Sequence, residues 1–437
     1  MKSRSFFRFD LIIFFAAVGL SIIGILFIYS SGISSDGVLQ NNEYIKQIVW
    51  ASIGIVIMIV LSFFDYERLR SLSFYIYGAN IILLLIVLFS GDVVNGARSW
   101  ISIRGIGFQP SEFMKISLIL RLGVYFEESR NKYSDFIRFL LGLIQAAIPM
   151  LLVIIQPDMG TALVYFPIFL TIAFVAGVKK RYLFFLLAAG FLTVMFSLIP
   201  AWDHYIITEK SVELTKVFTD PNLMMIVIGS LIFILVLSGI GLLLYKRKYF
   251  YWIGYAIIIL IIACSLAMGT SSFIKDYQLK RLIIFIDPQI DPQGAGWNMI
   301  QSVTAVGSGG TFGKGFLKGT QSHYRYLPQQ STDFIFSIIS EEWGFIGCLA
   351  VFLLFLIIMI RGLYILLTAK DEFALFVGCG IIGMIFFHFI VNIGMAMGIM
   401  PITGIPLLLV SYGGSSMFTT MIGLGLISSI YLHKYKY

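Results

Sequence analysis

Charged residues are scarce in this chain of 437 residues. Asp, Glu, Lys and Arg together make up 12% of it, whereas hydrophobic residues make up 59%. A soluble globular protein carries about a quarter of its residues as charged side chains, because its surface faces water. The shortage of charge therefore excludes a soluble globular protein, and we expect a membrane protein.

Cysteine and histidine are rarer still. The three cysteines, Cys264, Cys348 and Cys379, all fall inside apolar runs, so no disulfide framework is expected. The four histidines are scattered without the spacing of metal ligands, so no zinc site is expected. The alternating apolar and polar pattern of an outer-membrane barrel is also absent. These absences leave a helical membrane protein as the fold class.

Long apolar runs are what the chain does contain. A helix needs about 20 apolar residues to cross the hydrocarbon core, and its backbone must be satisfied within the helix. We predict an all-α polytopic membrane protein with about twelve transmembrane helices. The expected segments lie near residues 11–30, 45–64, 72–90, 111–126, 139–156, 161–178, 183–200, 223–245, 250–270, 336–360, 373–397 and 408–432.

Lys and Arg predict the orientation, since short cytoplasmic loops are enriched in both. An N-terminus in the cytoplasm places the basic clusters inside, and the C-terminus is then cytoplasmic too. The clusters are Lys2 to Arg8, Arg68 and Arg70, Arg130 to Arg138, Lys179 to Arg181, Lys246 to Lys248, and Lys434 and Lys436. The first apolar run is longer than a signal-peptide core, and we expect a retained helix. The net charge of +8 is mostly this topology signal, so no nucleic-acid partner is expected.

The domain organisation is predicted to be simple. No hydrophilic segment is large enough to fold alone, so residues 1–437 are expected to form a single membrane domain. Residues 222–270 are expected to be an inserted helical hairpin, because removing two spans keeps every other span on its side. Residues 271–335 are expected to form a large extracytoplasmic loop. A transporter with repeated halves would show interrupted helices at matching positions, and this chain does not.

Two aspartates in the long polar loop, Asp287 and Asp291, are each followed by proline. Proline disfavours the α conformation in the residue before it, so the pair is not expected inside one regular helix. A carboxylate near a low-dielectric boundary can have a raised pKa and act as a general base. The alternative is that both Asp-Pro pairs only start turns. Asp291 is our candidate for chemistry, and both interpretations stay open on these residues alone.

Glycines crowd the same loop from Gly307 to Gly315. A phosphate-binding P-loop would need Gly at position 308 and Ser or Thr at position 315, but the chain has Ser308 and Gly315. No nucleotide site is therefore expected. Backbone N–H groups together with Lys314 can still hold an anion such as pyrophosphate. A flexible outer loop without any ligand is the alternative.

A third cluster follows the loop from Gly91 to Pro110. Glu112 and Lys115 are three residues apart and share one face of the helix that begins there. A simple ion pair within the helix is the structural alternative. Ionisable groups at membrane depth, however, usually face a cavity or the bundle interior and mark a functional path. We therefore expect this pair to have a function.

Smaller signals follow the same reasoning. Asp158 places a carboxylate where Pro157 breaks the chain between two helices, and Arg281 precedes Asp291 by ten residues. Glu341 and Glu342 stand near the mouth of a span, where adjacent like charges perturb each other. His388 is expected to be a buried packing residue. Helix packing is the expected role of several further polar residues, namely Asn392, Thr403, Ser411 and Ser415.

These segments together resemble the SEDS family of bacterial cell-wall proteins, which includes RodA, FtsW and SpoVE. The matching stretches run in family order from about Gly96 to Ser416. They include 107–112 with Lys115, 156–162, 291–296, 301–302, 307–315, 332–336, 341–344, 392–395, 401–406 and 411–416. Residues 294–298 and 404–406 are more similar to the RodA branch than to the FtsW branch.

The resemblance implies a peptidoglycan glycosyltransferase that polymerises lipid II into β-1,4 glycan strands and releases undecaprenyl pyrophosphate. The expected role is cell-wall elongation and cell shape, and the expected place is the bacterial cytoplasmic membrane, with the active site on the extracytoplasmic side. Asp291 matches the family's catalytic aspartate. The substrate-binding candidates are Arg98, Trp100, Glu112, Lys115, Asp158, Arg281, Lys314 and Glu342. The implied partners are a class B penicillin-binding protein and other membrane proteins of the elongation or division complex.

Three departures from the family pattern stand out. The family usually has Arg directly before the tryptophan of the first loop, where this chain has Ser99, with Arg98 one position earlier. Gln329 and Ser331 replace residues that are often Glu and His. The hairpin lies outside the usual ten-helix pattern. No cofactor is established, and Mg²⁺ or Mn²⁺ bridging the pyrophosphate stays open. A lipid II flippase and a scaffold without catalysis are the alternative functions.

Overall fold

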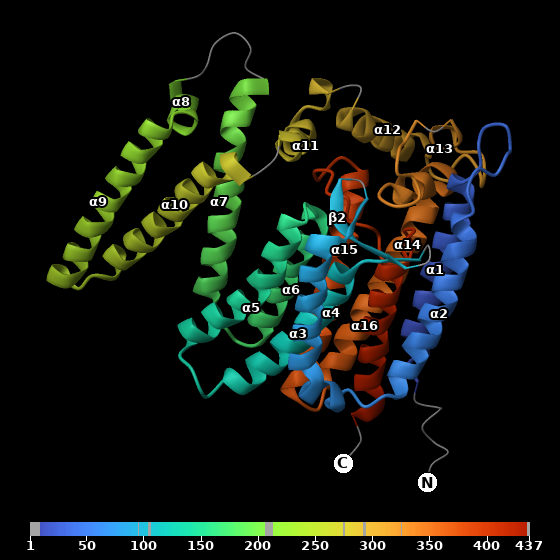
Figure 1. Ribbon diagram of the computed structural model, residues 1–437, viewed down its shortest axis with the longest axis horizontal. Coiled ribbons are helices and arrows are strands. Elements are labelled where there is room, and N and C mark those ends of the chain that lie inside the picture. The colour runs from blue at the N-terminus through green and yellow to red at the C-terminus, as the bar shows by residue number, and fades with distance from the viewer. Residues whose placement is uncertain are drawn as a thin grey trace. The chain divides into compact units, whose positions relative to one another are not determined.

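A computed structural model describes residues 9–434 apart from 95, 104–105, 206–212, 274–275, 292–293 and 325. Its described part forms two compact units, drawn in Figure 1. The first contains the chain up to residue 178 and again from residue 300, and the second contains residues 179–299. The helix α12 (Ala295–Ser308) begins in the second unit and continues into the first.

The first unit is a helical bundle. Its helices are α1 (Leu11–Ser31), α2 (Glu43–Phe63), α3 (Glu67–Ser90), α4 (Pro110–Ser129), α5 (Asp135–Ile155), α6 (Met159–Val175), α13 (Thr320–His323), α14 (Ile335–Leu367), α15 (Glu372–Ala396) and α16 (Gly414–His433). Figure 1 shows α4, α15 and α16 side by side in the middle of this unit. Most residues of α15 and α16 are buried, whereas only a few residues of α2 and α3 are buried. The centre of this unit is therefore where a polar side chain is best shielded.

The second unit contains α7 (Lys180–Tyr205), α8 (Glu213–Thr219), α9 (Pro221–Tyr245), α10 (Lys248–Phe273), α11 (Asp276–Ile286) and the short 3₁₀ turn η2 (Pro288–Ile290). α9 packs against α10, and α10 packs against α7. Met224, Cys264 and Ala267 form a small buried core between them. The segment expected to be an inserted hairpin is thus a pair of antiparallel helices, α9 and α10.

Each of the twelve predicted spans coincides with a helix. Ten described helices are long and apolar enough to cross a membrane. The remaining two are α4, which carries five charged residues, and α6, which has 17 residues. The prediction of a polytopic all-α membrane protein is confirmed. The single-domain organisation and the extracytoplasmic side of residues 271–335 stay predictions.

Side-chain oxygens mark where several helices begin. Asp10 accepts a hydrogen bond from the Ile13 backbone N–H at the start of α1. Asp220 and Asp371 cap α9 and α15 in the same way. Such caps satisfy backbone donors that have no partner inside the helix. Asp10 also receives an ion pair from Arg361 of α14, at 2.7 Å, so this cap also connects two spans.

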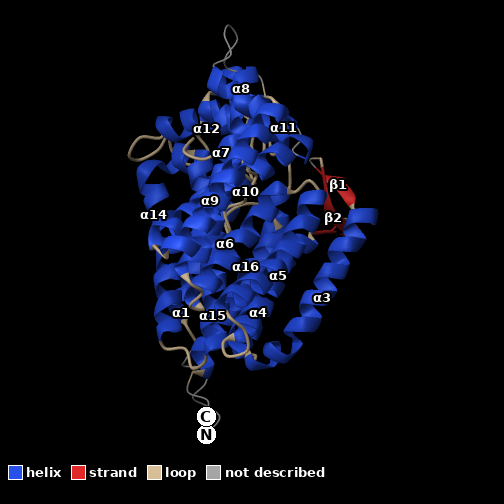
Figure 2. Cartoon of the chain, turned by 90° about the vertical axis from the view of Figure 1, so that its left-hand side faces the viewer, coloured by secondary structure: helices blue, strands red, loops and turns tan. Residues whose placement is uncertain are grey.

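A small antiparallel sheet replaces the plain loop that we predicted between Gly91 and Pro110. Its strands are β1 (Asp92–Val94), β2 (Ala97–Ile103) and β3 (Ile106–Phe108), in the order β1-β2-β3. Figure 2 shows β1 and β2 beside the end of α3. The strands were missed because they are too short to show a period in the sequence. The sheet carries the chain from α3 into α4.

Candidate functional site

Asp291 lies in a tight turn of the second unit. α11 ends at Ile286, and the Asp287 carboxylate accepts a hydrogen bond of 3.0 Å from the Gln289 N–H, which caps η2. Asp291 directly follows η2, with φ −134° and ψ 69°, and its carbonyl oxygen accepts from the Gly294 N–H at 3.2 Å. The expectation that the two aspartates do not share one helix is confirmed. The Asp287 side chain caps the N-terminus of η2, as expected if this Asp-Pro pair only starts a turn, whereas Asp291 stands at the C-terminal end of η2.

Two glycines shape this turn by leaving room for it. A Cβ atom placed on Gly294 would collide with the Asp291 carboxylate itself. A Cβ atom on Gly296 would collide with the backbone oxygens of Pro288 and Asp291. Only glycine allows such a close approach without moving the neighbour. The spacing of glycines after Asp291 therefore follows from the geometry of the turn. Arg281, on the exposed side of α11, belongs to the same unit.

Glu112 and Lys115 form the predicted pair on α4 in the first unit. Lys115 Nζ lies 2.6 Å from Glu112 Oε1, and the two residues are 1% and 3% exposed. Lys115 Nζ also lies 3.1 Å from Nε2 of His388, which is equally buried on α15. The second carboxylate oxygen, Glu112 Oε2, has no hydrogen-bond partner in the described part of the chain. A buried carboxylate oxygen of this kind is costly, so it is a candidate acceptor for a ligand.

Asp158 caps α6 and is held by a residue that the sequence did not single out. Its Oδ1 accepts from the Thr161 N–H at 3.2 Å, and its Oδ2 accepts from Gln109 Nε2 at 2.8 Å. The Gln109 N–H in turn donates to Ser415 Oγ, so α4, α6 and α16 begin close together. Burial raises the pKa of the Asp158 carboxyl, and the hydrogen bonds from Thr161 oppose that rise. The charge of Glu112 raises this pKa further.

Arg98 and Trp100 lie on β2. Neighbouring strand residues point to opposite faces, and here Arg98 is exposed whereas Ser99 is buried. Arg98 therefore does not occupy the inward position where the family usually has arginine. Its backbone N–H donates to the Gln156 carbonyl at 3.1 Å, which fixes β2 near the end of α5. The ring of Trp100 packs over Gly107 of β3.

α14 is broken at Gly344, where φ is 61° and ψ is −156°. This conformation is open almost only to glycine. The preceding loop docks into the break: the Phe345 N–H donates to the Gly310 carbonyl, and the Lys314 N–H donates to the Glu341 carbonyl. The glycine-rich stretch is thus paired to the broken helix by backbone hydrogen bonds, and its expected role in holding an anion stays a prediction.

Both glutamates before the break are completely buried and bonded. Glu341 Oε1 accepts from Lys314 Nζ at 2.7 Å and from the Thr320 N–H at 2.8 Å. Glu342 accepts from Ser30 Oγ of α1 and from the Leu317 N–H, and His323 Nε2 lies 3.6 Å from it. Lys314 is therefore ion-paired with Glu341 within the protein. The proposed substrate contacts of Lys314 and Glu342 stay predictions.

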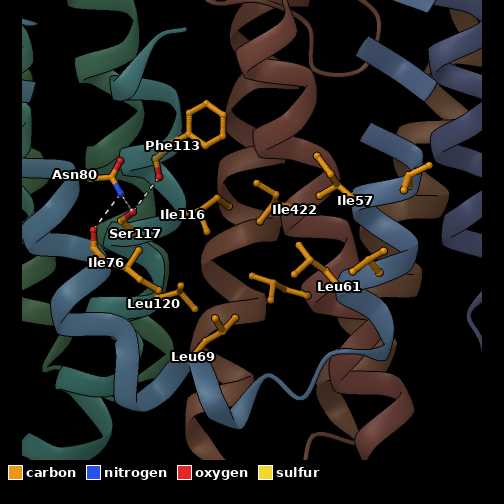
Figure 3. Close-up of a pocket in the computed structure, with 13 residues that line it drawn as sticks. Ile57, Leu61, Leu69, Ile76, Asn80, Phe113, Ile116, Ser117, Leu120 and Ile422 are labelled. Atoms are coloured by element: carbon orange, nitrogen blue, oxygen red, sulfur yellow. Dashed lines mark hydrogen bonds between the residues drawn. The ribbon is translucent and has the colours of Figure 1, made fainter. Parts of the chain in front are cut away.

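A cavity of about 440 Å³ lies between α2, α3, α4 and α16. Figure 3 shows apolar side chains of all four helices around it, among them Leu61, Leu69, Leu120 and Ile422. The two polar residues that line it, Asn80 and Ser117, make hydrogen bonds to other protein groups. Asn80 donates to Ser117 Oγ at 2.9 Å, and Ser117 donates to the Phe113 carbonyl at 3.1 Å. The cavity therefore suits an apolar chain.

The structure brings some predicted residues together and adds others. Glu112 and Lys115 form a pair, and Asp158 lies close enough to experience both charges. Gln109 and His388 were missed as site residues, because their partners come from distant parts of the sequence. Of these two residues, only Gln109 had a signal in the sequence, because it lies in the 107–112 stretch that resembles the family. No group of three potential metal ligands (His, Cys, Asp or Glu) occurs among the described residues.

Relatives of known name cover nearly the whole chain. A protein named peptidoglycan glycosyltransferase RodA, from Treponema pallidum, is 46% identical over 430 residues, covering 98% of this chain and 99% of its own. Stage V sporulation protein E of Bacillus subtilis is 31% identical, covering 96% of both chains. Peptidoglycan glycosyltransferase MrdB of Escherichia coli K12 is 29% identical, covering 95% of this chain and 92% of its own.

Solved structures support the same fold. A chain from a study titled "Structural coordination of polymerization and crosslinking by a peptidoglycan synthase complex" matches with a TM-score of 0.65 at 24% identity, covering 98% and 99% of the two chains. The rod shape determining protein RodA of Thermus thermophilus matches with a TM-score of 0.60 at 23% identity, covering 98% of both. The family model FtsW/RodA/SpoVE, described as cell cycle protein, matches residues 10–222 and 212–436. The chain is a member of the FtsW, RodA and SpoVE family.

Proposed function

We propose that this protein is a peptidoglycan glycosyltransferase of the RodA type, which polymerises lipid II for cell-wall elongation. The observation that carries the proposal is the 46% identity, over nearly the full length of both chains, to a protein of that name. The turn around Asp291 supports it, because two glycines there leave room for a carboxylate that η2 does not use as its cap.

The reaction joins two sugars with inversion at one carbon. The 4-hydroxyl oxygen of the acceptor sugar attacks the anomeric carbon of the donor, and the bond from that carbon to the α-linked pyrophosphate breaks. The pyrophosphate oxygen keeps the electron pair of that bond and leaves still attached to its polyprenyl carrier, and the hydroxyl proton passes to Asp291. A single displacement needs a general base and no covalent nucleophile. Asp291 is the residue that we assign to this role.

The departing pyrophosphate accumulates negative charge, which fixed cations stabilise. Arg98, Lys115, Arg281 and Lys314 are our candidates for this role. Arg98 and Arg281 have exposed side chains, whereas Lys115 is buried beside Glu112. A divalent cation, Mg²⁺ or Mn²⁺, is proposed to arrive with the pyrophosphate, since such ions take phosphate oxygens as ligands. Chelation with EDTA tests this requirement.

The polyprenyl chain of the substrate is proposed to occupy the cavity between α2, α3, α4 and α16. Phe113 and Ser117 line it from the same helix that carries Glu112 and Lys115. The apolar chain and the polar pair would therefore meet on neighbouring faces of α4. We place the protein in the bacterial cytoplasmic membrane with its chemistry on the extracytoplasmic side. A class B penicillin-binding protein is the proposed partner.

The test compares purified wild-type protein with Asp291→Asn, with and without a class B penicillin-binding protein, on labelled lipid II. We expect glycan polymer from the wild type and at least a hundredfold less from Asp291→Asn, the size of a lost general base. Asp287→Asn is the matched control, because an asparagine oxygen can still cap η2. Near-normal polymer from Asp291→Asn would remove the assignment.

The buried charges of α4 favour one other function, a lipid II flippase, since polar groups at membrane depth can line a path. Translocation of labelled lipid II in vesicles separates the two functions. A flippase would translocate lipid II without making polymer, and Asp291→Asn would leave translocation unchanged. Polymer formation by the purified protein would decide for the glycosyltransferase.

A further inference from the structure

His388 is a buried polar side chain that joins two other parts of the first unit. It lies on α15, and its Nε2 is 3.1 Å from Nζ of Lys115 on α4. Its Nδ1 is 3.0 Å from the carbonyl oxygen of Pro406, in the segment between α15 and α16. The residue is 1% exposed, so neither contact is shared with bulk water. The packing role that we expected from the sequence does not require either contact.

The two contacts together determine which ring nitrogen carries the proton. A carbonyl oxygen can only accept, so Nδ1 must donate its hydrogen to Pro406. A lysine ammonium can only donate, so Nε2 must carry a lone pair. His388 is therefore the neutral Nδ1–H tautomer. In a doubly protonated ring, the Nε2–H of His388 would face the Lys115 ammonium, and both groups can only donate.

The same contacts hold the ammonium of Lys115. Two of its three N–H groups are directed to Glu112 Oε1, at 2.6 Å, and to His388 Nε2. A buried ammonium without acceptors is costly, and each acceptor restricts where the amine can lie. The long lysine side chain would otherwise have four rotatable bonds with which to leave Glu112. With both acceptors present, the amine and Glu112 keep one mutual arrangement.

We propose that His388 is a positioning residue, which holds Lys115 against Glu112 and couples that pair to the segment around Pro406. This inference deepens the proposed glycosyltransferase function and rests on it where activity is the readout. Glu112 Oε2, which has no partner in the described part of the chain, then keeps a fixed orientation toward an incoming polar group. The ligand expected there is a hydroxyl or amide group of the sugar substrate.

Asn392 contacts the segment between α15 and α16 without a described contact to Lys115. Asn392 lies one turn further along α15, and its amide donates to the carbonyls of Ile405 and Asp333 at 2.8 and 2.9 Å. Asn392 and His388 therefore both bind the segment around Pro406, but only His388 has a described contact with Lys115. A substitution of Asn392 therefore removes contacts to this segment without removing a contact to Lys115.

The experiment is a double-mutant cycle on polymer formation with His388→Phe, Lys115→Met and both together. His388→Phe keeps the ring volume and removes both polar contacts, and we expect kcat to fall by roughly ten- to a hundredfold, as for a misplaced site group. In the Lys115→Met background the same change should have little further effect. His388→Gln carries both a donor and an acceptor, so it should restore most of the activity.

Asn392→Ala is the matched control, and its effect should be as large in the Lys115→Met background as in the wild type. Independent effects of His388→Phe and Lys115→Met would overturn the proposal. Spectroscopy supplies a readout without activity: in ¹⁵N-histidine-labelled protein, with only four histidines, His388 should be the Nδ1–H tautomer. Its Nε2 resonance should shift when Lys115→Met removes the donor. An Nε2–H tautomer in the wild type would also overturn it, even if the protein makes no polymer.

Discussion

Asp158 shows how one carboxyl group can connect two helix ends and still be unfavourably placed. It caps α6, accepts from Gln109 before α4, and lies where burial raises its pKa. A carboxyl whose pKa is raised on folding binds its proton more tightly in the folded state. The folded protein is therefore favoured most at low pH, and this contribution is lost as the pH rises through the raised pKa.

We predict that Asp158→Asn becomes more stable relative to the wild type as the pH rises. The asparagine oxygen keeps the cap to Thr161, and its amide stays neutral at every pH. The measurement is the midpoint of thermal unfolding in detergent at pH 5 and pH 8. The variant should gain several degrees on the wild type between the two values. An equal difference at both pH values would contradict the raised pKa.

At the residue scale, the sequence could locate charges but not their partners. The Glu112 and Lys115 pair was visible because helix spacing places the two side chains on one face. The His388 contact joins residues 273 positions apart, and it depends on how α4 and α15 pack. The same holds for Gln109 and Asp158, which come from different helices. Long-range contacts of this kind have no local signature.

At the scale of elements, the turn from η2 to α12 makes a specific prediction about two glycines. Gly294→Ala places a methyl group against the Asp291 carboxylate, which is a side chain that can move aside. We predict that this variant folds normally and loses polymerase activity by about tenfold or more, because the carboxylate is displaced. Polymer yield and the thermal unfolding midpoint are the two measurements.

Gly296→Ala serves as the comparison for Gly294→Ala. Its methyl group would meet the backbone oxygens of Pro288 and Asp291, which cannot turn away as a side chain can. We expect this variant to lower stability as well as activity. If Gly294→Ala retained full activity with an unchanged midpoint, the carboxylate would not depend on the turn in the way that we describe.

The spans were predictable as elements because long apolar runs have one solution in lipid. The helix α4 was found despite its charges, since its apolar residues still cover most of its length. The break at Gly344 was not predicted, because a single glycine inside a long, mostly apolar run is compatible with a continuous helix. The need for glycine there comes from the loop around Gly313 that approaches the break, which is a property of the packed structure.

For the whole molecule, the paired helices α9 and α10 predict a tolerated deletion. Removing residues 222–270 takes out two spans, so every later span should keep its direction across the membrane. We predict that a reporter fused after α16 stays on the same side as one fused before α1. Reporters that are active on only one side of the membrane measure this directly. A reversal of the C-terminal reporter would show that the hairpin does not cross as a pair.

Contacts inside the first unit are consistent with both chain ends lying on the same side of the membrane. Asp10, just before α1, pairs with Arg361, which also lies over the ring of Tyr431 near the end of α16. Figures 1 and 2 show these helix ends together. The sequence predicted this from the distribution of Lys and Arg. Which side is cytoplasmic is the part that the reporter experiment tests.

The buried carboxylate of Glu342 has a consequence for biogenesis. Its partners are Ser30 of α1, 312 positions earlier, and the Leu317 N–H of the loop before α14. The chain leaves the ribosome from its N-terminus, so both partners emerge before Glu342 does. A carboxylate is costly in lipid unless a partner receives it. We therefore expect insertion of α14 to depend on the earlier arrival of α1, so that this membrane protein assembles in a defined order.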